Sequence, residues 1–226
     1  MKRMNVLLGI LLVFGLMFSA SPVKAQEEEE SSVWSTGADL YSNYIFRGVK
    51  YGSGPSFQPY VEAAIGGLAI GAWGAFDAAG FAESDLYIAY GFDFGLSLGV
   101  TDYYYPGSDY SDFSTESGSH AIEINLGYEI GGLSLAGNYI VNEAGSAGSA
   151  GGDMYYEVGY SFDNVGFFFG MGDGWHTSDG EFDVVNVGLS TSKEIKITDN
   201  YSLPVSGSVI WNPESKQQFV VVGVSF

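Results

Sequence analysis

The chain has 226 residues, of which 27 are acidic and 8 are basic, so that its formal net charge is −19. This balance argues against nucleic-acid binding, which usually depends on a basic patch, and the absence of cysteine excludes disulfide bonds and thiolate chemistry. A hydrophobic content of 46%, with 16% aromatic residues, argues against disorder.

The first 25 residues have the pattern of a secretory signal peptide. Lys2 and Arg3 give it a positive start, and the apolar stretch over residues 6–18 is too short to span a membrane as a helix. We therefore predict a signal peptide over residues 1–25, with an uncleaved N-terminal anchor as the alternative. The acidic run that follows predicts a solvated periplasmic tail over residues 26–33.

From Ala38 onward, apolar residues alternate with small or polar ones at a period of two, in twelve segments of about 8–10 residues each. Connections after even segments are short, as at Gly66-Gly67, whereas those after odd segments are longer and polar, as at residues 106–119. Residues 192–200 are the exception. The pattern predicts an all-β, closed antiparallel transmembrane β-barrel over residues 34–226, with twelve strands, short periplasmic turns and longer extracellular loops.

Aromatic residues on the outward faces are expected to form two girdles at the membrane surfaces. A soluble β-sandwich would also alternate, and its aromatic residues would then cap a core. The periplasmic girdle is predicted to hold Tyr90, Phe92, Tyr128, Tyr160, Phe162 and Phe226, and the extracellular girdle Tyr44, Phe46, Phe76, Tyr104, Tyr139 and Trp211.

Two prolines fall inside predicted strands. Pro59 lies in the second segment and Pro204 in the eleventh. A closed barrel has no free edge at which a missing N–H group is harmless, so each proline predicts a bulge or a strand end.

The inward faces collect acidic residues and one base. Arg47 is expected on the first strand near its extracellular end. An acid-rich lumen favours cations over anions, whereas the alternative is that these groups are structural and bonded to lumen tyrosines. The predicted pore-lining and selectivity residues are Arg47, Tyr60, Glu62, Asp77, Asp85, Tyr87, Glu123, Tyr155 and Glu157.

Four short motifs resemble a known family. The stretch Ser42–Gly48 (SNYIFRG) resembles the N-terminal signature of the TorF family of porin-like bacterial outer-membrane proteins, and AWG at 72–74, ESDLY at 83–87 and YYPG at 104–107 resemble later parts of it. The resemblance implies a porin-like barrel without establishing transport. The terminal Phe226 resembles the C-terminal signal of outer-membrane barrels, which implies the barrel-assembly machinery as a partner.

Enzyme and metal chemistry find little support in the sequence. Neither His120 nor His176 has a serine nearby in a nucleophile motif. The acids of residues 102–116 lack the spacing of a calcium-binding loop. We therefore expect no enzymatic activity, no cofactor and no metal.

A twelve-stranded barrel has a lumen between those of filled eight-stranded barrels and wide porins. We accordingly expect passive diffusion of ions and small solutes, leaning to cations, in the outer membrane of a Gram-negative-type bacterium. The expected partners are outer-membrane lipid and small ions or solutes, with no nucleic acid. The alternative is a closed barrel, plugged by aromatic residues, with a structural or surface-binding role.

Overall fold

The computed structural model describes residues 33–226, so the predicted signal peptide (1–25) and all but the last residue of the predicted tail (26–33) lie outside the described residues. Within this part of the chain, no helix is long and apolar enough to cross a membrane. The strands are β1 (Trp34–Tyr41), β2 (Tyr44–Phe46), β3 (Val49–Tyr51), β4 (Ser56–Ile65), β5 (Leu68–Asp77), β6 (Ala82–Gly91), β7 (Leu96–Tyr104), β8 (His120–Ile130), β9 (Leu133–Ile140), β10 (Met154–Phe162), β11 (Val165–Gly172), β12 (Asp183–Lys196), β13 (Ser202–Asn212) and β14 (Gln217–Ser225), with short 3-10 turns η1 (Gly145–Ala147) and η2 (Gly174–His176).

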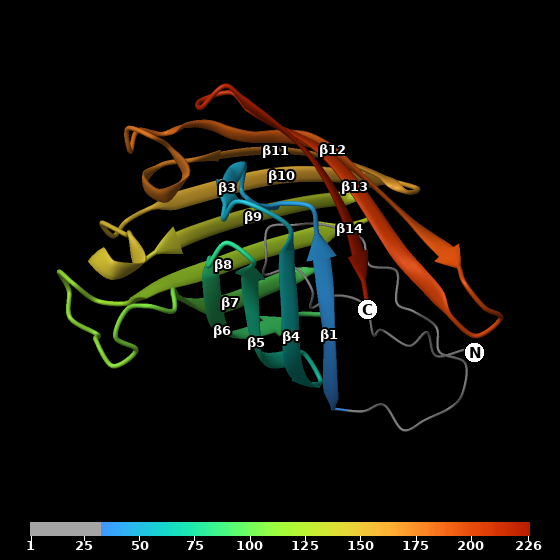
Figure 1. Ribbon diagram of the computed structural model, residues 1–226, viewed down its shortest axis with the longest axis horizontal. Coiled ribbons are helices and arrows are strands. Elements are labelled where there is room, and N and C mark those ends of the chain that lie inside the picture. The colour runs from blue at the N-terminus through green and yellow to red at the C-terminus, as the bar shows by residue number, and fades with distance from the viewer. Residues whose placement is uncertain (1–32) are drawn as a thin grey trace.

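Twelve of these strands close into one antiparallel barrel (Figure 1). Each strand from β4 to β13 pairs with the next one along the chain, β1 pairs with β4, and β14 pairs with β1 to close the barrel. The remaining two strands, β2 and β3, pair only with each other. The predicted all-β, closed, twelve-stranded antiparallel barrel is therefore confirmed.

The two ends of the barrel differ in their connections. One end, here the short-turn end, has tight links such as Gly66-Gly67, where Gly66 takes a positive φ of 61°. The other, the long-loop end, carries the connections over residues 105–119, 141–153 and 173–182. The long link expected at residues 192–200 is instead mostly strand, because β12 runs to Lys196 and the β12–β13 hairpin extends beyond its neighbours.

The two prolines are accommodated without a register shift. Pro59 pairs with Ala38 of β1, while the β4–β5 ladder skips Gln58 and Pro59 and resumes in the same register at Tyr60. Pro204 pairs with Glu194 but lies beyond the β13–β14 ladder, which begins at Val205. The bulge predicted for Pro59 is thus absent, because the missing N–H group interrupts the pairing of β4 with β5 without shifting its register. Pro204 marks the end of the pairing between β13 and β14.

Apolar side chains cover the outside of the barrel. Leu40, Ile88, Ile124 and Leu189, on four different strands, are all exposed. Most of the predicted girdle residues are exposed as well. The prediction is wrong for Tyr44 and Phe46, which are only 3% and 5% exposed, because β2 does not belong to the wall of the barrel.

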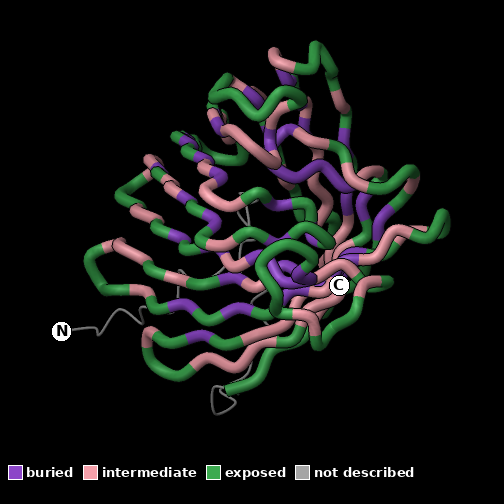
Figure 2. Tube along the Cα trace, turned by 90° about the vertical axis from the view of Figure 1, so that its left-hand side faces the viewer, coloured by how far each residue is buried: buried purple, intermediate pink, exposed green. Residues whose placement is uncertain are grey.

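The buried core lies inside the barrel at its long-loop half. One cluster gathers around Tyr44, Phe46 and Tyr103, and a second gathers around Tyr41 and Ile45. Along the wall strands, buried and exposed residues alternate, as the tube in Figure 2 shows. The hairpin β2–β3 is therefore the element around which the interior packs.

The seam between β1 and β14 predicts a specific cross-link. Ala38 and Phe226 exchange two backbone hydrogen bonds, so their neighbours Asp39 and Ser225 form a non-hydrogen-bonded pair. Such pairs bring Cα atoms to about 4.5 Å, within disulfide range. Because the chain has no cysteine of its own, Asp39→Cys with Ser225→Cys should cross-link on oxidation and change mobility on a non-reducing gel. The pair Asp39→Cys with Ser208→Cys is the control and should not cross-link; if both pairs behaved alike, the closed order of strands would be contradicted.

Candidate functional site in the barrel lumen

The hairpin β2–β3 leaves the wall and enters the lumen. Tyr41 at the end of β1 pairs directly with Ser56 at the start of β4, so the residues between them are an insertion in one hairpin connection. Phe46 pairs with Val49, and the two residues between them, Arg47 and Gly48, have positive φ values of 50° and 82°. This is the geometry of a type I′ turn, which suits a two-residue hairpin.

The tip of the hairpin is seated on strands far along the chain. A Cβ atom on Gly48 would lie 1.9 Å from the carbonyl oxygen of Val185, so only glycine fits between the tip and the backbone of that residue. Asn212 of β13 donates through Nδ2 to the carbonyl oxygen of Gly48 at 3.1 Å. The position of the tip is therefore fixed by both contact and hydrogen bonding.

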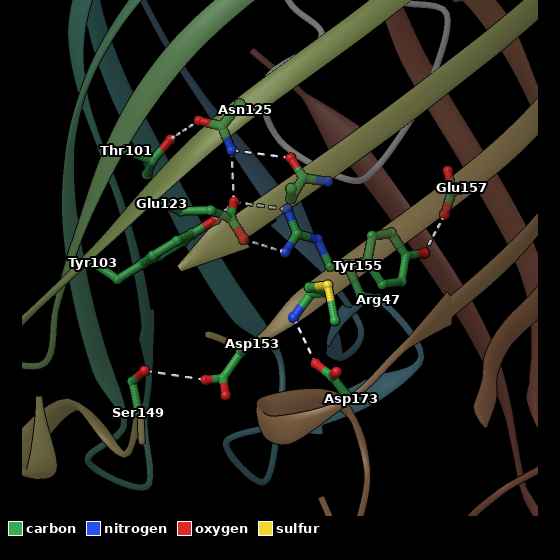
Figure 3. Close-up of polar contacts among 12 residues, drawn as sticks. Arg47, Thr101, Tyr103, Glu123, Asn125, Ser149, Asp153, Tyr155, Glu157 and Asp173 are labelled. Carbon is green, nitrogen blue, oxygen red and sulfur yellow. Dashed lines mark hydrogen bonds and ion pairs between the residues drawn. The ribbon is translucent and has the colours of Figure 1, made fainter. Parts of the chain in front are cut away.

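Arg47 binds Glu123 of β8 in a two-pronged ion pair (Figure 3). The distances are 2.6 Å from Nη1 to Oε1 and 2.9 Å from Nη2 to Oε2. Both side chains are 1% exposed. Taking two charges out of water is costly, and it is compensated only where the geometry and further hydrogen bonds are good. We call this ion pair the latch.

Strands β7 and β8 supply the further hydrogen bonds of Glu123, and β9 supports them through Asn138. Tyr103 donates its hydroxyl to Oε2 at 2.9 Å, and Asn125 donates its amide to the same oxygen at 2.6 Å. Asn125 is held in turn by Thr101 and Asn138. The carboxylate is thus held in one orientation by hydrogen bonds that do not involve Arg47, which favours one seated position of the hairpin.

Two aromatic rings flank the guanidinium, and one of them belongs to a second group of hydrogen-bonded polar residues. The guanidinium carbon lies 4.6 Å from the ring centre of Phe46 and 4.7 Å from that of Tyr155, within cation–π range. Tyr155 donates its hydroxyl to Glu157, and Asn186 of β12 donates to both, at 2.9 Å each. The cation is therefore held between a carboxylate and two aromatic faces.

The two faces of the hairpin pack differently. Ile45 packs against the apolar wall of Tyr41, Ile210 and Val221. On the other face, the ring of Tyr44 lies 5.6 Å from that of Trp73, and further aromatic rings surround it. Apolar contact and the latch together hold the hairpin inside the long-loop half of the barrel.

The structure places the predicted site residues in three groups. Arg47, Glu123, Tyr155 and Glu157 meet in the latch region, although Arg47 is on the hairpin and not on a barrel strand, which corrects that prediction. Asp85, another predicted site residue, is buried on the inward face of β6 and takes no part in the latch.

The second and third groups lie apart from the latch. Tyr60, Glu62 and Tyr87 face inward from β4 and β6, and Tyr87 donates to Glu62 at 2.8 Å. Asp77 stays at the long-loop rim, where it accepts from the backbone N–H groups of Ser53, Ala79 and Phe81 and so shapes two loops.

Several important residues were missed by sequence reasoning. They are small polar residues on inward faces, and nothing in the sequence distinguishes them from other polar residues that line a lumen: Thr101, Asn125, Asn138 and Asn186. The signal that could have found the hairpin is Arg47-Gly48 between two short apolar-aromatic runs, a two-residue turn pattern.

Burial also shifts the pKa values of groups in the long-loop connections, among them His176 and Asp153. His176 of η2 is buried, and burial together with the positive charge of Arg47 holds the pKa of its imidazole well below the usual value. Burial raises the pKa of the Asp153 carboxyl. Within residues 33–226, no group of three or more histidine, aspartate or glutamate side chains is arranged to hold a metal ion.

Comparison with solved structures finds engineered variants of the porin from Rhodopseudomonas blastica. Two of them are 14% identical to this chain, with TM-scores of 0.40 and 0.39. Each match covers 76% of this chain and 55% of the porin, so the chain spans about half the length of the porins it matches. No family profile and no curated protein matches the chain. The resemblance to the TorF family stays a prediction.

The latch predicts a strong coupling between its two partners. Arg47→Met leaves Glu123 buried without its cation, and Glu123→Gln leaves Arg47 buried without its anion. Each change should lower the free energy of unfolding by about 3–5 kcal/mol. The double variant should lose markedly less than the sum, by about 0.5–3 kcal/mol. Urea unfolding in detergent, followed by intrinsic fluorescence, measures this, with the exposed Lys50→Met on the same hairpin as control; strict additivity would contradict the latch.

His176 predicts a pH dependence of stability. Its pKa is lower in the folded chain than in the unfolded one, so as pH falls below about 6.5 the unfolded chain takes up a proton that the folded chain does not. Stability should therefore fall over this window. Unfolding curves between about pH 7 and 5 should show a smaller loss for His176→Gln than for the natural chain, and identical slopes would rule out this origin.

Proposed function

We propose that this chain is a bacterial outer-membrane barrel that carries its own plug, formed by hairpin β2–β3. In the resting state the latch closes the long-loop half of the lumen. Displacement of the hairpin opens a narrow, cation-preferring path for ions and small solutes. The observation that carries the proposal is the seated hairpin tip, with Arg47 buried against Glu123.

The exterior of the barrel supports a membrane location. Its exposed apolar residues come from strands all round the barrel, as a lipid-facing wall requires. Aromatic residues are exposed near both ends, among them Trp34, Phe162 and Phe226 at the short-turn end and Tyr139 and Trp211 at the other. In this proposal the short-turn end faces the periplasm and the long loops face the outside.

The contents of the lumen favour the plugged form over an open pore as the resting state. Tyr44, Phe46 and Tyr103 are almost fully buried inside a barrel whose interior would otherwise be wet. The expectation of simple passive diffusion is thereby narrowed to diffusion after displacement of the plug. A closed barrel with a purely structural or surface-binding role remains the second candidate, and the buried aromatic cluster favours it.

The short-turn half of the lumen supports the cation preference. Its inward faces carry Asp39, Glu62 and Glu129, of which Glu62 is half-buried and Glu129 is exposed. Carboxylates that line a path attract cations and repel anions. The predicted selectivity residues of this half are therefore Glu62, with Tyr60 and Tyr87 beside it.

Export and assembly belong to the same proposal. It includes a signal peptide over residues 1–25, a periplasmic tail over residues 26–33 and a barrel domain over residues 34–226. Phe226 is proposed as the residue recognised by the barrel-assembly machinery. Outer-membrane lipid is the surrounding partner, and the proposal includes no enzymatic activity.

Conductance across a planar lipid bilayer tests the plug. Replacing residues 43–54 with a short glycine–serine turn keeps the pairing of Tyr41 with Ser56 and removes the hairpin. We expect the natural chain to conduct rarely and the shortened chain to conduct steadily. In a salt gradient the shortened chain should show a cation-selective reversal potential, which Glu62→Gln should move toward zero.

The control is Lys50→Gln, on the exposed side of the same hairpin, which should behave as the natural chain does. Equal steady conductance of the natural and shortened chains would refute the plug. If the shortened chain folded but stayed silent, the channel role would fail and the structural or surface-binding candidate would stand.

A further inference from the structure

The hairpin formed by β12 and β13 extends past its neighbours at the short-turn end of the barrel (Figure 1). Strand β12 pairs with β11 only as far as Thr191, whereas its pairing with β13 continues to Lys196 and Ser202. Strand β13 in turn pairs with β14 only from Val205 onward. Residues 193–204 therefore project from the rim as a two-stranded ribbon, with neither β11 nor β14 paired to its edges. We call this segment the ribbon.

The two faces of the ribbon differ in chemistry, because it keeps the alternation of the barrel strands. On β12, Leu189 is exposed on the outside of the wall and Ser190 is buried inside it. The same parity puts Ile195 on the outer face, directly opposite Leu203 of β13. The outer face carries Lys193, Ile195 and Leu203, and the inner face carries Glu194, Lys196 and Ser202. The side that continues the outside of the barrel is therefore the more apolar one.

The end of the ribbon presents large apolar side chains from a structured turn. Ile195, Ile197 and Tyr201 are 46%, 56% and 43% exposed. The carbonyl oxygen of Tyr201 accepts hydrogen bonds from the backbone N–H groups of Ile197 and Thr198, at 3.0 Å each. The turn is thus closed on itself, and the three side chains stand away from both buried clusters of the barrel.

The edges of the ribbon do not favour pairing with a further protein strand. Ile197 and Tyr201 share a backbone hydrogen bond, and hydrogen-bonded pairs alternate with non-hydrogen-bonded ones along an antiparallel ladder. Pro204 therefore faces the free edge, where it has no N–H group to donate to an added strand. Lys193 and Lys196 lie along the other strand, and lysine and proline at an edge both oppose edge-to-edge association. A second copy of the chain is thus a poor occupant.

A lipid surface fits the outer face of the ribbon better. This face continues the apolar wall, where Leu189 pairs with Phe167 of β11 and the two are 43% and 55% exposed. Tyrosine is enriched at the level of the lipid headgroups, and a lysine can keep its stem on apolar surface while its charge reaches them. Tyr201 and Lys193 supply these two residue types. The ribbon extends about 13 Å beyond Lys193 along its strands, long enough to cross a headgroup layer of about 5–8 Å.

We propose that the ribbon lies against the phospholipid leaflet at the short-turn end of the barrel. Ile195, Ile197 and Tyr201 enter the interface, and Lys193 binds the phosphate groups of anionic phospholipid. The ribbon thereby anchors one side of the rim to the membrane surface. This inference rests on the membrane location in the proposed function, but it depends neither on the plug nor on conduction.

Spin labelling of the full chain tests the position of the ribbon, and the absence of native cysteine allows one label at a time. The variants are Ile195→Cys on the outer face, Glu194→Cys on the inner face and Leu189→Cys on the wall, each in vesicles of phosphatidylethanolamine and phosphatidylglycerol. We expect oxygen, which concentrates in lipid, to relax the labels at positions 195 and 189 more than a water-soluble nickel chelate does. The label at position 194 should respond in the opposite way.

The label on the wall separates failure of this inference from failure of the proposed function. If position 195 responded to the nickel chelate as position 194 does, while position 189 stayed in lipid, the ribbon would lie in water and the proposal would be overturned. Spin–spin broadening at position 195 that disappeared on dilution with unlabelled chain would identify a second copy as the occupant and overturn it too. If position 189 were itself in water, the membrane location would fail, and this inference with it.

The role of Lys193 has its own test in the chain labelled at position 195. Lys193→Gln should weaken the seating of the ribbon by about fivefold in vesicles that contain phosphatidylglycerol, seen as a smaller response to oxygen. It should change little in vesicles of phosphatidylcholine alone, which have no net charge. Lys216→Gln, in the turn between β13 and β14 at the long-loop end, is the matched control. Equal effects of the two substitutions would overturn the assignment of Lys193 to the headgroups.

Discussion

A guanidinium buried inside a barrel must find an anion, and in this chain that requirement decides where hairpin β2–β3 sits. Arg47 meets Glu123 with both of its terminal nitrogens, and Glu123 is already oriented by Tyr103 and Asn125. Removing either charge leaves the other stranded away from water. The position of the hairpin and the two buried clusters around it are consistent with this one pairing.

The outline of the fold was predictable because a closed barrel repeats one rule. Alternation follows from the geometry of the sheet, and short turns at one end with an even strand count are typical of outer-membrane barrels. The barrel has twelve strands, with short turns at one end. The β12–β13 hairpin and the prolines were harder. An unpaired N–H in one ladder changes neither the alternation nor the register, so Pro59 could not be read from its neighbours.

The hairpin could not be found from periodicity. Tyr44 and Phe46 have the same even parity as the outward Leu40, so a strand running straight on would turn them to the outside. The chain instead turns after Tyr41, so these two residues lie inside the barrel. Which acid receives Arg47 depends on how the sheet curves, since Glu123 is 76 residues further on. The inward acids could be predicted, but their pairing could not.

The separation along the chain of the hairpin and its seat has a consequence for assembly. The tip is an early part of the sequence, yet the side chain that bonds Gly48 comes from Asn212, 164 residues later. Contacts of long sequence separation form late, because loop-closure entropy must be overcome first. Strand β13 must be in place before the tip has its full seat. In a barrel that works as we propose, the wall would thus close before the tip docks, and the lumen would be unobstructed for the interval between the two events.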